Sequence, residues 1–267
     1  VYSPINGEII SQVNMSGKDA VDEAVKTASA AFEEWSQKTL KERVQVFFKY
    51  KQLLEENMDE LSELIQEENG KTFGEAKAEI EKSIEVTEFA CSLPQIASGE
   101  IQEVSRGVEC RINRAPLGVV ASITPFNFPS MVPNWTIPNA IALGNAMILK
   151  PSEQVPLSAN RLAELLHDAG LPDGVLNIVH GGQEAVEAIC DHPGIEAITF
   201  VGSTKVAKIV YQRGAASLKR MLALGGAKNH LIVLPDAHPE MAASNIAASM
   251  SGCAGQRCMA AAGPHTH

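Results

Sequence analysis

Two thiols near the end of the chain have the surroundings of a nucleophile. Small residues lie on both sides of the pair Cys253 and Cys258, and Arg257 directly precedes Cys258. Small neighbours let a substrate reach backbone N–H groups, and an adjacent cation favours the nucleophilic thiolate. On a single helix this spacing would turn the two side chains about 140° apart, so only one could face a substrate. Cys258 is the stronger candidate and Cys253 the alternative, although a buried structural role is the commoner fate of a cysteine.

A stiff loop with one amide offers a partner for such a nucleophile. Asn127 stands between two aromatic residues and two prolines in the segment 125–129, directly after an apolar β-branched run. A fixed side-chain amide can donate a hydrogen bond to a developing oxyanion. The competing interpretation is a local Asx-type turn, which this loop taken alone favours.

A cation and a carboxylate follow the next apolar run. Lys150 and Glu153 could bind ribose hydroxyls, and Glu153 would repel a 2′-phosphate and so favour NAD over NADP. The alternative is a helix start with Ser152 as the N-cap and Glu153 in the first turn. A third loop, residues 202–204, combines glycine with hydroxyls at a helix start, where either a phosphate or a plain N-cap fits.

The elements that must position these loops fall into two parts. Amphipathic helices are predicted over residues 16–37, 41–68 and 72–92, followed by an extended ribbon over 99–114. After residue 115, short β-branched runs alternate with helical stretches. These runs are residues 118–123, 146–149, 175–179, 197–201 and 231–234. This alternation predicts an α/β fold with a doubly wound, Rossmann-like parallel sheet behind an N-terminal helical arm, with ligands beyond the carboxyl ends of the strands.

The composition excludes several classes of partner. The 267 residues carry a formal net charge of −10, which argues against nucleic acid and anionic membranes as partners. No apolar stretch approaches the ~20 residues of a membrane span. The five cysteines are sparse and odd in number, which indicates free thiols in a reducing compartment, and the seven histidines lack metal-ligand spacing. We therefore expect a cytoplasmic enzyme, or a mitochondrial matrix enzyme in a eukaryote, without a metal.

Taken together, five motifs resemble those of the aldehyde dehydrogenase superfamily in order and spacing. They are the segments 125–129, 150–153, 200–204, 224–226 and 255–258. The resemblance extends from about residue 1 to 262. Segments 226–230 and 255–259 are similar to the CoA-acylating methylmalonate-semialdehyde dehydrogenase branch.

The resemblance implies a role for each candidate residue. Cys258 would attack an aldehyde to form a thiohemiacetal, with Asn127 and the Cys258 backbone N–H as the oxyanion hole. Hydride would pass to NAD, and Arg257 would contact a substrate carboxylate. The implied cofactor contacts include Lys150 and Glu153 at the adenosine ribose and Ser203 at the pyrophosphate. The full cofactor-binding set is Ile123, Thr124, Phe126, Lys150, Glu153, Gly202, Ser203 and Leu224.

Two departures from the family pattern refine that expectation. Hydrolytic members carry a glutamate where this chain has Ala223, so coenzyme A is expected to accept the acyl group from Cys258. The branch also uses an upstream arginine for the substrate carboxylate, but no arginine lies between Arg43 and Arg106. Lys82 could replace it only as a point charge, without a bidentate clamp.

The resemblance also implies a division of the chain. Residues 1–114 would form the helical arm and the start of an oligomerisation ribbon, 115–235 the NAD-binding domain, and 236–267 the start of a truncated catalytic domain. Family members are about twice as long and form homo-oligomers, so this chain alone is expected to be inactive or prone to aggregation. The competing functions are a hydrolytic aldehyde dehydrogenase with a base from elsewhere and an inactive NAD-binding fragment.

Overall fold

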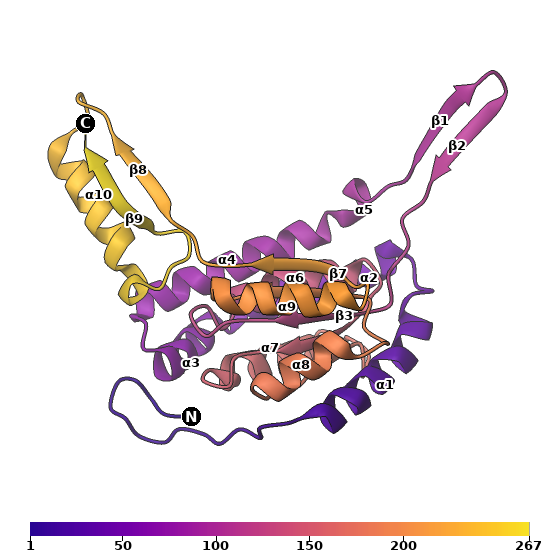
Figure 1. The fold of residues 1–267 in the computed structure, drawn as a ribbon, viewed down its shortest axis with the longest axis horizontal. Helices are drawn as coiled ribbons and strands as arrows, with labels where there is room; N and C mark the ends of the chain where they lie inside the picture. Colours follow the sequence, from indigo (N-terminus) through magenta and orange to yellow (C-terminus); the bar gives the residue numbers. More distant parts are fainter. Residues whose placement is uncertain (267) are drawn as a thin grey trace.

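The structure is a computed structural model that describes residues 1–266. Helices cover both faces of a central parallel sheet, which gives the body three layers (Figure 1). The sheet consists of β3 (Val119–Ile123), β4 (Ala146–Lys150), β5 (Leu176–Ile178), β6 (Ala197–Val201) and β7 (Arg220–Leu224). Its strand order is β5-β4-β3-β6-β7. The direction of winding reverses between β3 and β6, so the predicted doubly wound α/β fold is confirmed.

Strand residues alternate between two hydrophobic cores. One core packs the sheet against the helices α2 (Leu40–Glu56), α3 (Met58–Asn69), α4 (Phe73–Cys91), α6 (Met131–Ala142) and α7 (Pro156–Asp168). The other core packs it against α1 (Lys18–Trp35), α8 (Gln183–Asp191) and α9 (Thr204–Ala216). Met147 of β4 faces the first core and Ile148 the second. Both faces of β3 and β4 are buried, so these two strands read as continuous apolar runs rather than as alternating ones.

The helix predicted over residues 41–68 is in fact two helices. α2 ends at Glu56 and α3 begins at Met58, with Asn57 between them. The Asn57 side chain donates to the Leu53 carbonyl at 2.7 Å and so satisfies the last turn of α2. Asparagine competes for backbone hydrogen bonds in this way, which the apolar periodicity across the break does not reveal.

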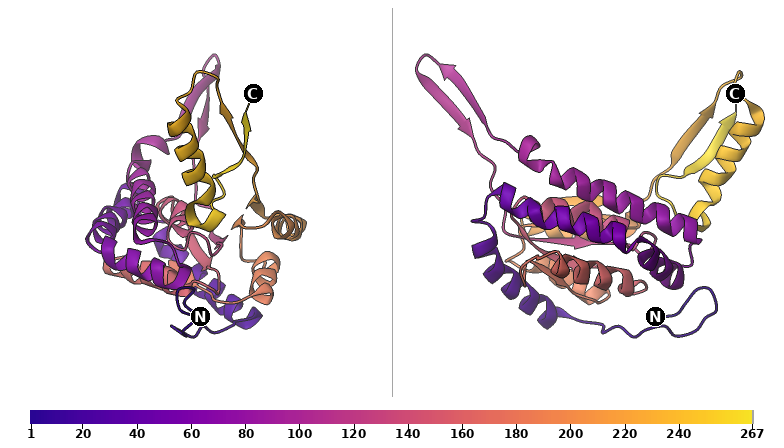
Figure 2. Two further views of the ribbon diagram at one scale, coloured as in Figure 1. Left: turned by 90° about the vertical axis from the view of Figure 1, so that its left-hand side faces the viewer. Right: turned by 180° about the vertical axis from the view of Figure 1, so that it is seen from behind.

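Two segments project from the body. β1 (Glu100–Ser105) and β2 (Val108–Ile112) form an antiparallel hairpin whose residues are all exposed, and this confirms the predicted ribbon. The C-terminal module consists of β8 (Asn229–Val233), α10 (Pro239–Ser251), the short 3-10 helix η1 (Gly252–Gly255) and β9 (Ala261–Thr266). Hairpin and module stand at opposite ends of the body (Figures 1 and 2), connected to it by short segments.

Two expectations about strands are wrong. The run predicted at residues 231–234 forms β8, which pairs in parallel with β9 in a separate sheet and not with the central one. The fifth strand of the central sheet is instead β7, which the sequence pattern missed. None of the residues 220–224 is β-branched, so pairing with β6 rather than local propensity makes this segment a strand.

Candidate active site

The carboxyl ends of β3, β4 and β6 surround a groove of about 640 Å³. Of the predicted cofactor contacts, all but Leu224 line it: Ile123, Thr124, Phe126, Lys150, Glu153, Gly202 and Ser203. Leu224 lies at the end of the neighbouring strand, where its carbonyl accepts a hydrogen bond from the Gly202 N–H at 3.1 Å. Parallel strands bring these loops together because their carboxyl ends share one edge of the sheet.

Lys150 and Glu153 form an ion pair inside this groove. The Lys150 Nζ lies 3.1 Å from Glu153 Oε2, and the lysine side chain is almost buried. Burial opposes ionisation of Glu153, but its own backbone N–H and the Lys150 ammonium outweigh burial and lower its pKa. Ser152 is not the N-cap of α7, because Val155 holds that position and the Ser152 hydroxyl accepts from the Gln154 N–H. The pair therefore presents one cation and one carboxylate to a ligand.

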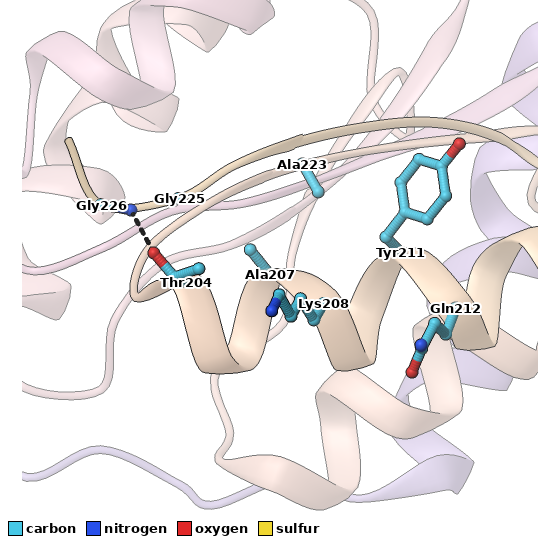
Figure 3. Close-up of a pocket in the computed structure, with 8 residues that line it drawn as sticks. All are labelled: Thr204, Ala207, Lys208, Tyr211, Gln212, Ala223, Gly225 and Gly226. Atoms are coloured by element: carbon cyan, nitrogen blue, oxygen red, sulfur yellow. Dashed lines mark hydrogen bonds between the residues drawn. The ribbon is translucent and has the colours of Figure 1, made fainter.

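The N-terminus of α9 faces the same groove. Ser203 is the N-cap, and its hydroxyl accepts from the Val206 N–H at 3.4 Å. The capping role is thus present, and it leaves the helix N-terminus available for an anion. The next hydroxyl, on Thr204, accepts from the Gly226 N–H at 3.0 Å and ties the loop after β7 to α9, as Figure 3 shows.

The groove has features that fit a dinucleotide. It carries ionised side chains for ribose hydroxyls, a helix N-terminus for a pyrophosphate, and apolar walls that include Val206, Ile209 and Val210 for a flat ring. The Thr124 hydroxyl lies in its wall, buried and without a hydrogen-bond partner among the described residues. Buried hydroxyls normally have a hydrogen-bond partner, so a polar ligand or a water molecule in the groove is expected to supply the partner of the Thr124 hydroxyl.

A second cavity, of about 330 Å³, adjoins the groove and contains the predicted nucleophile. Cys258, Asn127 and Arg257 all line it, and Phe126, Gly202 and Ser203 line both spaces. The Asn127 Nδ2 donates to the Gln256 carbonyl at 2.6 Å. This bond holds the amide beside residues 252–260, which we call the cysteine segment, rather than in a local Asx turn. An amide nitrogen carries two hydrogens, so one N–H remains for an oxyanion.

Arg257 is paired inside the protein. Its NH2 lies 3.1 Å from Glu75 Oε1, and the same oxygen accepts from the Cys253 N–H at 2.8 Å. Burial opposes ionisation of Glu75, but the Cys253 N–H, Thr72 and Arg257 together lower its pKa. Arg257 is therefore already paired, and a substrate carboxylate would have to compete with Glu75 for the guanidinium.

Cys253 occupies a different position from Cys258. It is buried in η1 with a left-handed φ of 51°, and it lines a neighbouring cavity of about 610 Å³ beside α4. The expected helical relation between the two cysteines does not hold, because the chain leaves α10 at Gly252 before Cys253. Cys258 alone of the two lines the cavity with Asn127.

Two further expectations concern charge near Cys258. Lys82 pairs with Glu85 at 2.8 Å on the exposed surface of α4 and lines neither cavity beside the cysteines. Ala223 lines a separate pocket between α9 and β7, distinct from the cofactor groove, where it presents only a methyl group (Figure 3). The described residues that line the Cys258 cavity include no carboxylate and no imidazole. None of them can therefore act as the general base of a hydrolytic reaction.

Sequence reasoning missed the acidic residues of α4. Glu75 holds the cysteine segment, and Glu79 accepts from the backbone of Ser130 and Met131 in the loop after β3. The available signal was the Thr72 to Glu75 spacing, which marks a helix N-terminus and gives no hint of a distant partner.

In residues 1–266 no helix is long and apolar enough to cross a membrane, and no cluster of potential metal ligands was found.

Comparison with known proteins adds independent findings. Residues 1–263 match the sequence profile of the aldehyde dehydrogenase family. Malonate-semialdehyde dehydrogenase 2 of Bacillus thuringiensis (strain Al Hakam) is 50% identical over 262 residues, which cover 98% of this chain and 54% of that protein. The crystal structure of methylmalonate-semialdehyde dehydrogenase from Oceanimonas doudoroffii is similar, with a TM-score of 0.97, 43% identity, and coverage of 100% of this chain and 55% of that one.

A solved structure from Sinorhizobium meliloti 1021 gives the same TM-score of 0.97 at 43% identity. It is assigned as a methylmalonate-semialdehyde dehydrogenase complexed with NAD, and the match covers 100% of this chain and 54% of that one. The chain thus spans about half the length of the relatives it matches.

Proposed function

The chain belongs to the aldehyde dehydrogenase family, and from that premise we propose that it carries the NAD site and the nucleophile of a CoA-acylating semialdehyde dehydrogenase. The substrate would be a carboxylated semialdehyde such as malonate or methylmalonate semialdehyde, as the names of the relatives suggest. The observation that carries the proposal is that Cys258 and Asn127 line one cavity, which shares Phe126, Gly202 and Ser203 with the adjoining groove.

The proposed first step is addition of the Cys258 thiolate to the aldehyde carbonyl. The new carbon–sulfur bond turns the carbonyl oxygen into an oxyanion, which the free N–H of Asn127 and the Cys258 backbone N–H would stabilise. The Asn127 amide is held in place for this role by its bond to the Gln256 carbonyl. NAD held in the adjoining groove would supply the hydride acceptor, and loss of hydride from the thiohemiacetal carbon would leave a thioester on Cys258.

The residues of the groove would hold that cofactor. Lys150 and Glu153 suit the two hydroxyls of a ribose, and the N-terminus of α9 at Ser203 suits a pyrophosphate. The NAD bound in the Sinorhizobium meliloti relative supports this choice of cofactor.

The absence of a carboxylate or imidazole among the described lining residues favours transfer to a thiol over hydrolysis. In the proposed second step the thiolate of CoA attacks the thioester, the carbon–sulfur bond to Cys258 breaks, and acyl-CoA leaves. A thiol needs less activation than water because a fraction of it is ionised at neutral pH. The resemblance agrees with this choice, because this chain has Ala223 at the position where hydrolytic members of the family carry a glutamate, although Ala223 itself lies outside the Cys258 cavity.

The test is a reaction of the chain with NAD and malonate or methylmalonate semialdehyde, with and without CoA. NADH formation and the mass of the Cys258 peptide are followed together. An active acylating enzyme should form a thioacyl adduct on Cys258 without CoA and discharge it with continued NADH formation when CoA is added, whereas the inactivity expected of this chain alone would give neither an adduct nor NADH. An adduct that water discharges as fast without CoA as with CoA would instead identify a hydrolytic enzyme.

A second candidate is an NAD-binding unit that completes no reaction. One observation favours it: α10, which leads to the cysteine segment, has no buried side chain, and Ile232, Leu234 and Met241 of the same module are largely exposed. Binding of NAD without any adduct on Cys258 would support this candidate. In either case we propose a division after residue 114, as expected from the sequence, and a second one before β8 instead of at residue 235, because β8 pairs with β9 in the C-terminal module. We also propose a homo-oligomer, for which the fully exposed β1–β2 hairpin offers an unpaired edge.

A further inference from the structure

α4 carries a row of polar side chains on a face that packs against the interior. Glu75, Glu79, Ser83 and Thr87 follow one another at intervals of four, which places them on one side of the helix. The last three are buried, with relative exposures of 2%, 0% and 0%. Burying a carboxylate or a hydroxyl is costly unless it is hydrogen-bonded, so the partners of this row explain why the helix has it.

The first residue of the row holds the segment that contains Cys258. Glu75 Oε1 accepts from the Cys253 N–H at 2.8 Å and from the Arg257 guanidinium at 3.1 Å. Both donors belong to the stretch between α10 and β9, whose other described contacts with the body include the bond between Asn127 and Gln256. Figure 1 shows α4 running along the body to the base of the C-terminal module.

One turn further along, Glu79 holds the loop that contains Asn127. Its Oε1 accepts from the Ser130 N–H at 2.8 Å and the Met131 N–H at 3.0 Å, at the N-terminus of α6. Its Oε2 pairs with Lys71, and both side chains of this ion pair are almost fully buried. A carboxylate on the N-terminal amides of a helix gains from the helix dipole as well as from the hydrogen bonds.

Three more contacts fasten the same loop. The Lys71 Nζ lies 3.8 Å from the centroid of the Phe128 ring, and the Asn69 Nδ2 donates to the Phe126 carbonyl at 2.9 Å. Ser83, the third residue of the row, lies 3.1 Å from Ser130, oxygen to oxygen. Contacts therefore reach residues on both sides of Asn127 from the end of α3 and the first turns of α4.

We infer that Glu79 is a positioning residue, which sets the place of Asn127 relative to Cys258 while Glu75 holds the cysteine segment from the same helix. This inference rests on the proposed function, in which those two groups act on one oxyanion. α4 is a continuous helix, so its two carboxylates fix the two loops in one frame, although the loops lie about 130 residues apart in sequence. Such alignment matters because displacement of a catalytic group by about 1 Å can cost about 100-fold in rate.

The test compares Glu79→Gln with a matched control, Glu68→Gln. Glu68 is equally buried and also accepts two backbone N–H groups at a helix N-terminus, those of Leu157 and Ser158 in α7. Among the described residues, no hydrogen bond or ion pair joins Glu68 to Asn127, Cys258 or their loops. Both substitutions remove a buried charge, so comparing them separates a general loss of stability from a local loss of position. Hydrogen exchange by mass spectrometry and NAD titration apply to the full chain whether or not it turns over.

We expect Glu79→Gln to raise exchange in the peptide of residues 126–131 by about tenfold or more, the size set by a lost charge-assisted contact. Glu68→Gln should raise exchange at the start of α7 and leave 126–131 unchanged. NAD affinity should stay within about twofold in both variants, because neither residue lines the cofactor groove. Equal exchange of the 126–131 peptide in Glu79→Gln and the wild type would overturn the inference.

If Glu79→Gln does not fold, Glu79→Asp serves instead, because it keeps a buried charge beside Lys71 but withdraws the carboxylate from the Ser130 and Met131 N–H groups by one methylene. It should raise exchange at 126–131 by a few-fold, and no increase would count against the inference.

Where the wild type forms the Cys258 adduct, Glu79→Gln should slow its formation about 10- to 100-fold without changing the NAD affinity. A wild type that forms no adduct refutes the proposed function, while the exchange data still decide whether Glu79 positions the loop.

Discussion

The cofactor groove lies at the ends of strands of the central sheet, of which β3 and β4 are buried on both faces, whereas Cys258 lies between α10 and β9 in a module with mostly exposed side chains. Lys150 and Ile123 are the last residues of strands in the central sheet, and both are buried. The module that carries Cys258 depends on contacts with Glu75 and Asn127 for its place on the body. The difference indicates that cofactor binding is built into the core, while alignment of the nucleophile depends on a few polar contacts.

The largest expected effect is a loss of reaction at Cys258 without a loss of cofactor binding in the groove. Cys258→Ala should abolish the acyl adduct and NADH formation, since no other described thiol lines the cavity with Asn127. NAD affinity, measured by titration, should stay within about twofold because the groove does not include Cys258. Cys110→Ala, on the exposed hairpin, is the control and should keep both properties. An adduct that persists in Cys258→Ala would move the nucleophile elsewhere, with Cys253 the first alternative.

The next effect compares the stability of the two regions. Ile148 in β4 is fully buried, so Ile148→Ala should lower the free energy of unfolding by about 2–5 kcal/mol. Met241 in α10 is 62% exposed, and Met241→Ala should change it by less than about 0.5 kcal/mol. Urea denaturation followed by circular dichroism measures both. Comparable losses would show that the C-terminal module is packed against a partner in solution.

Sequence reasoning succeeded where local pattern and site coincide. The strands β3, β4 and β6 and the loops after them could be predicted, because apolar runs and the polar residues that follow them lie close together in sequence. β7 could not, since its residues have no strand preference and only pairing with β6 makes them a strand. β8 was found as a strand but placed in the wrong sheet, because a short β-branched run does not show which strand it pairs with.

The contacts of α4 were out of reach for a different reason. Glu79 lies within the amphipathic pattern of α4, where charged residues normally indicate a solvated face, and Lys71 lies in the short connection between α3 and α4. Their burial follows from the approach of the loop after β3, about 50 residues later in the chain, which supplies the N–H groups that make a buried carboxylate tolerable. The same holds for Arg257, whose partner Glu75 is 182 residues away.

A smaller effect tests the charge in the groove. Glu153→Gln should raise the affinity for NADP relative to NAD by about tenfold, because it removes a carboxylate that repels a 2′-phosphate and leaves Lys150 unneutralised. Titration with both cofactors measures the ratio. The matched control is Glu187→Gln, since Glu187 also lines the groove but pairs with Arg213 at 2.9 Å. An equal shift in both variants would mean that general charge, not Glu153, selects the cofactor.

The smallest effect concerns how acid loosens the cysteine segment. The folded chain lowers the pKa of Glu75, so Glu75 stays ionised to a lower pH when folded than when unfolded. Its hold on Cys253 and Arg257 is therefore fully present above the ordinary glutamate pKa of about 4.3 and is lost as the pH falls through the lower folded value.

This change can be measured with a disulfide reagent that reacts with thiols at acidic pH. The quantity measured is the ratio of the reaction rate of Cys258 to that of Cys110, which is exposed and serves as the reference in the same molecule. The ratio should stay level from pH 7 to about 5 and rise a few-fold below the ordinary glutamate range. Glu75→Gln should show the raised ratio already at pH 7 and no further acid step. A wild-type step near neutral pH would contradict this account, because a group with a lowered pKa cannot release its partners there.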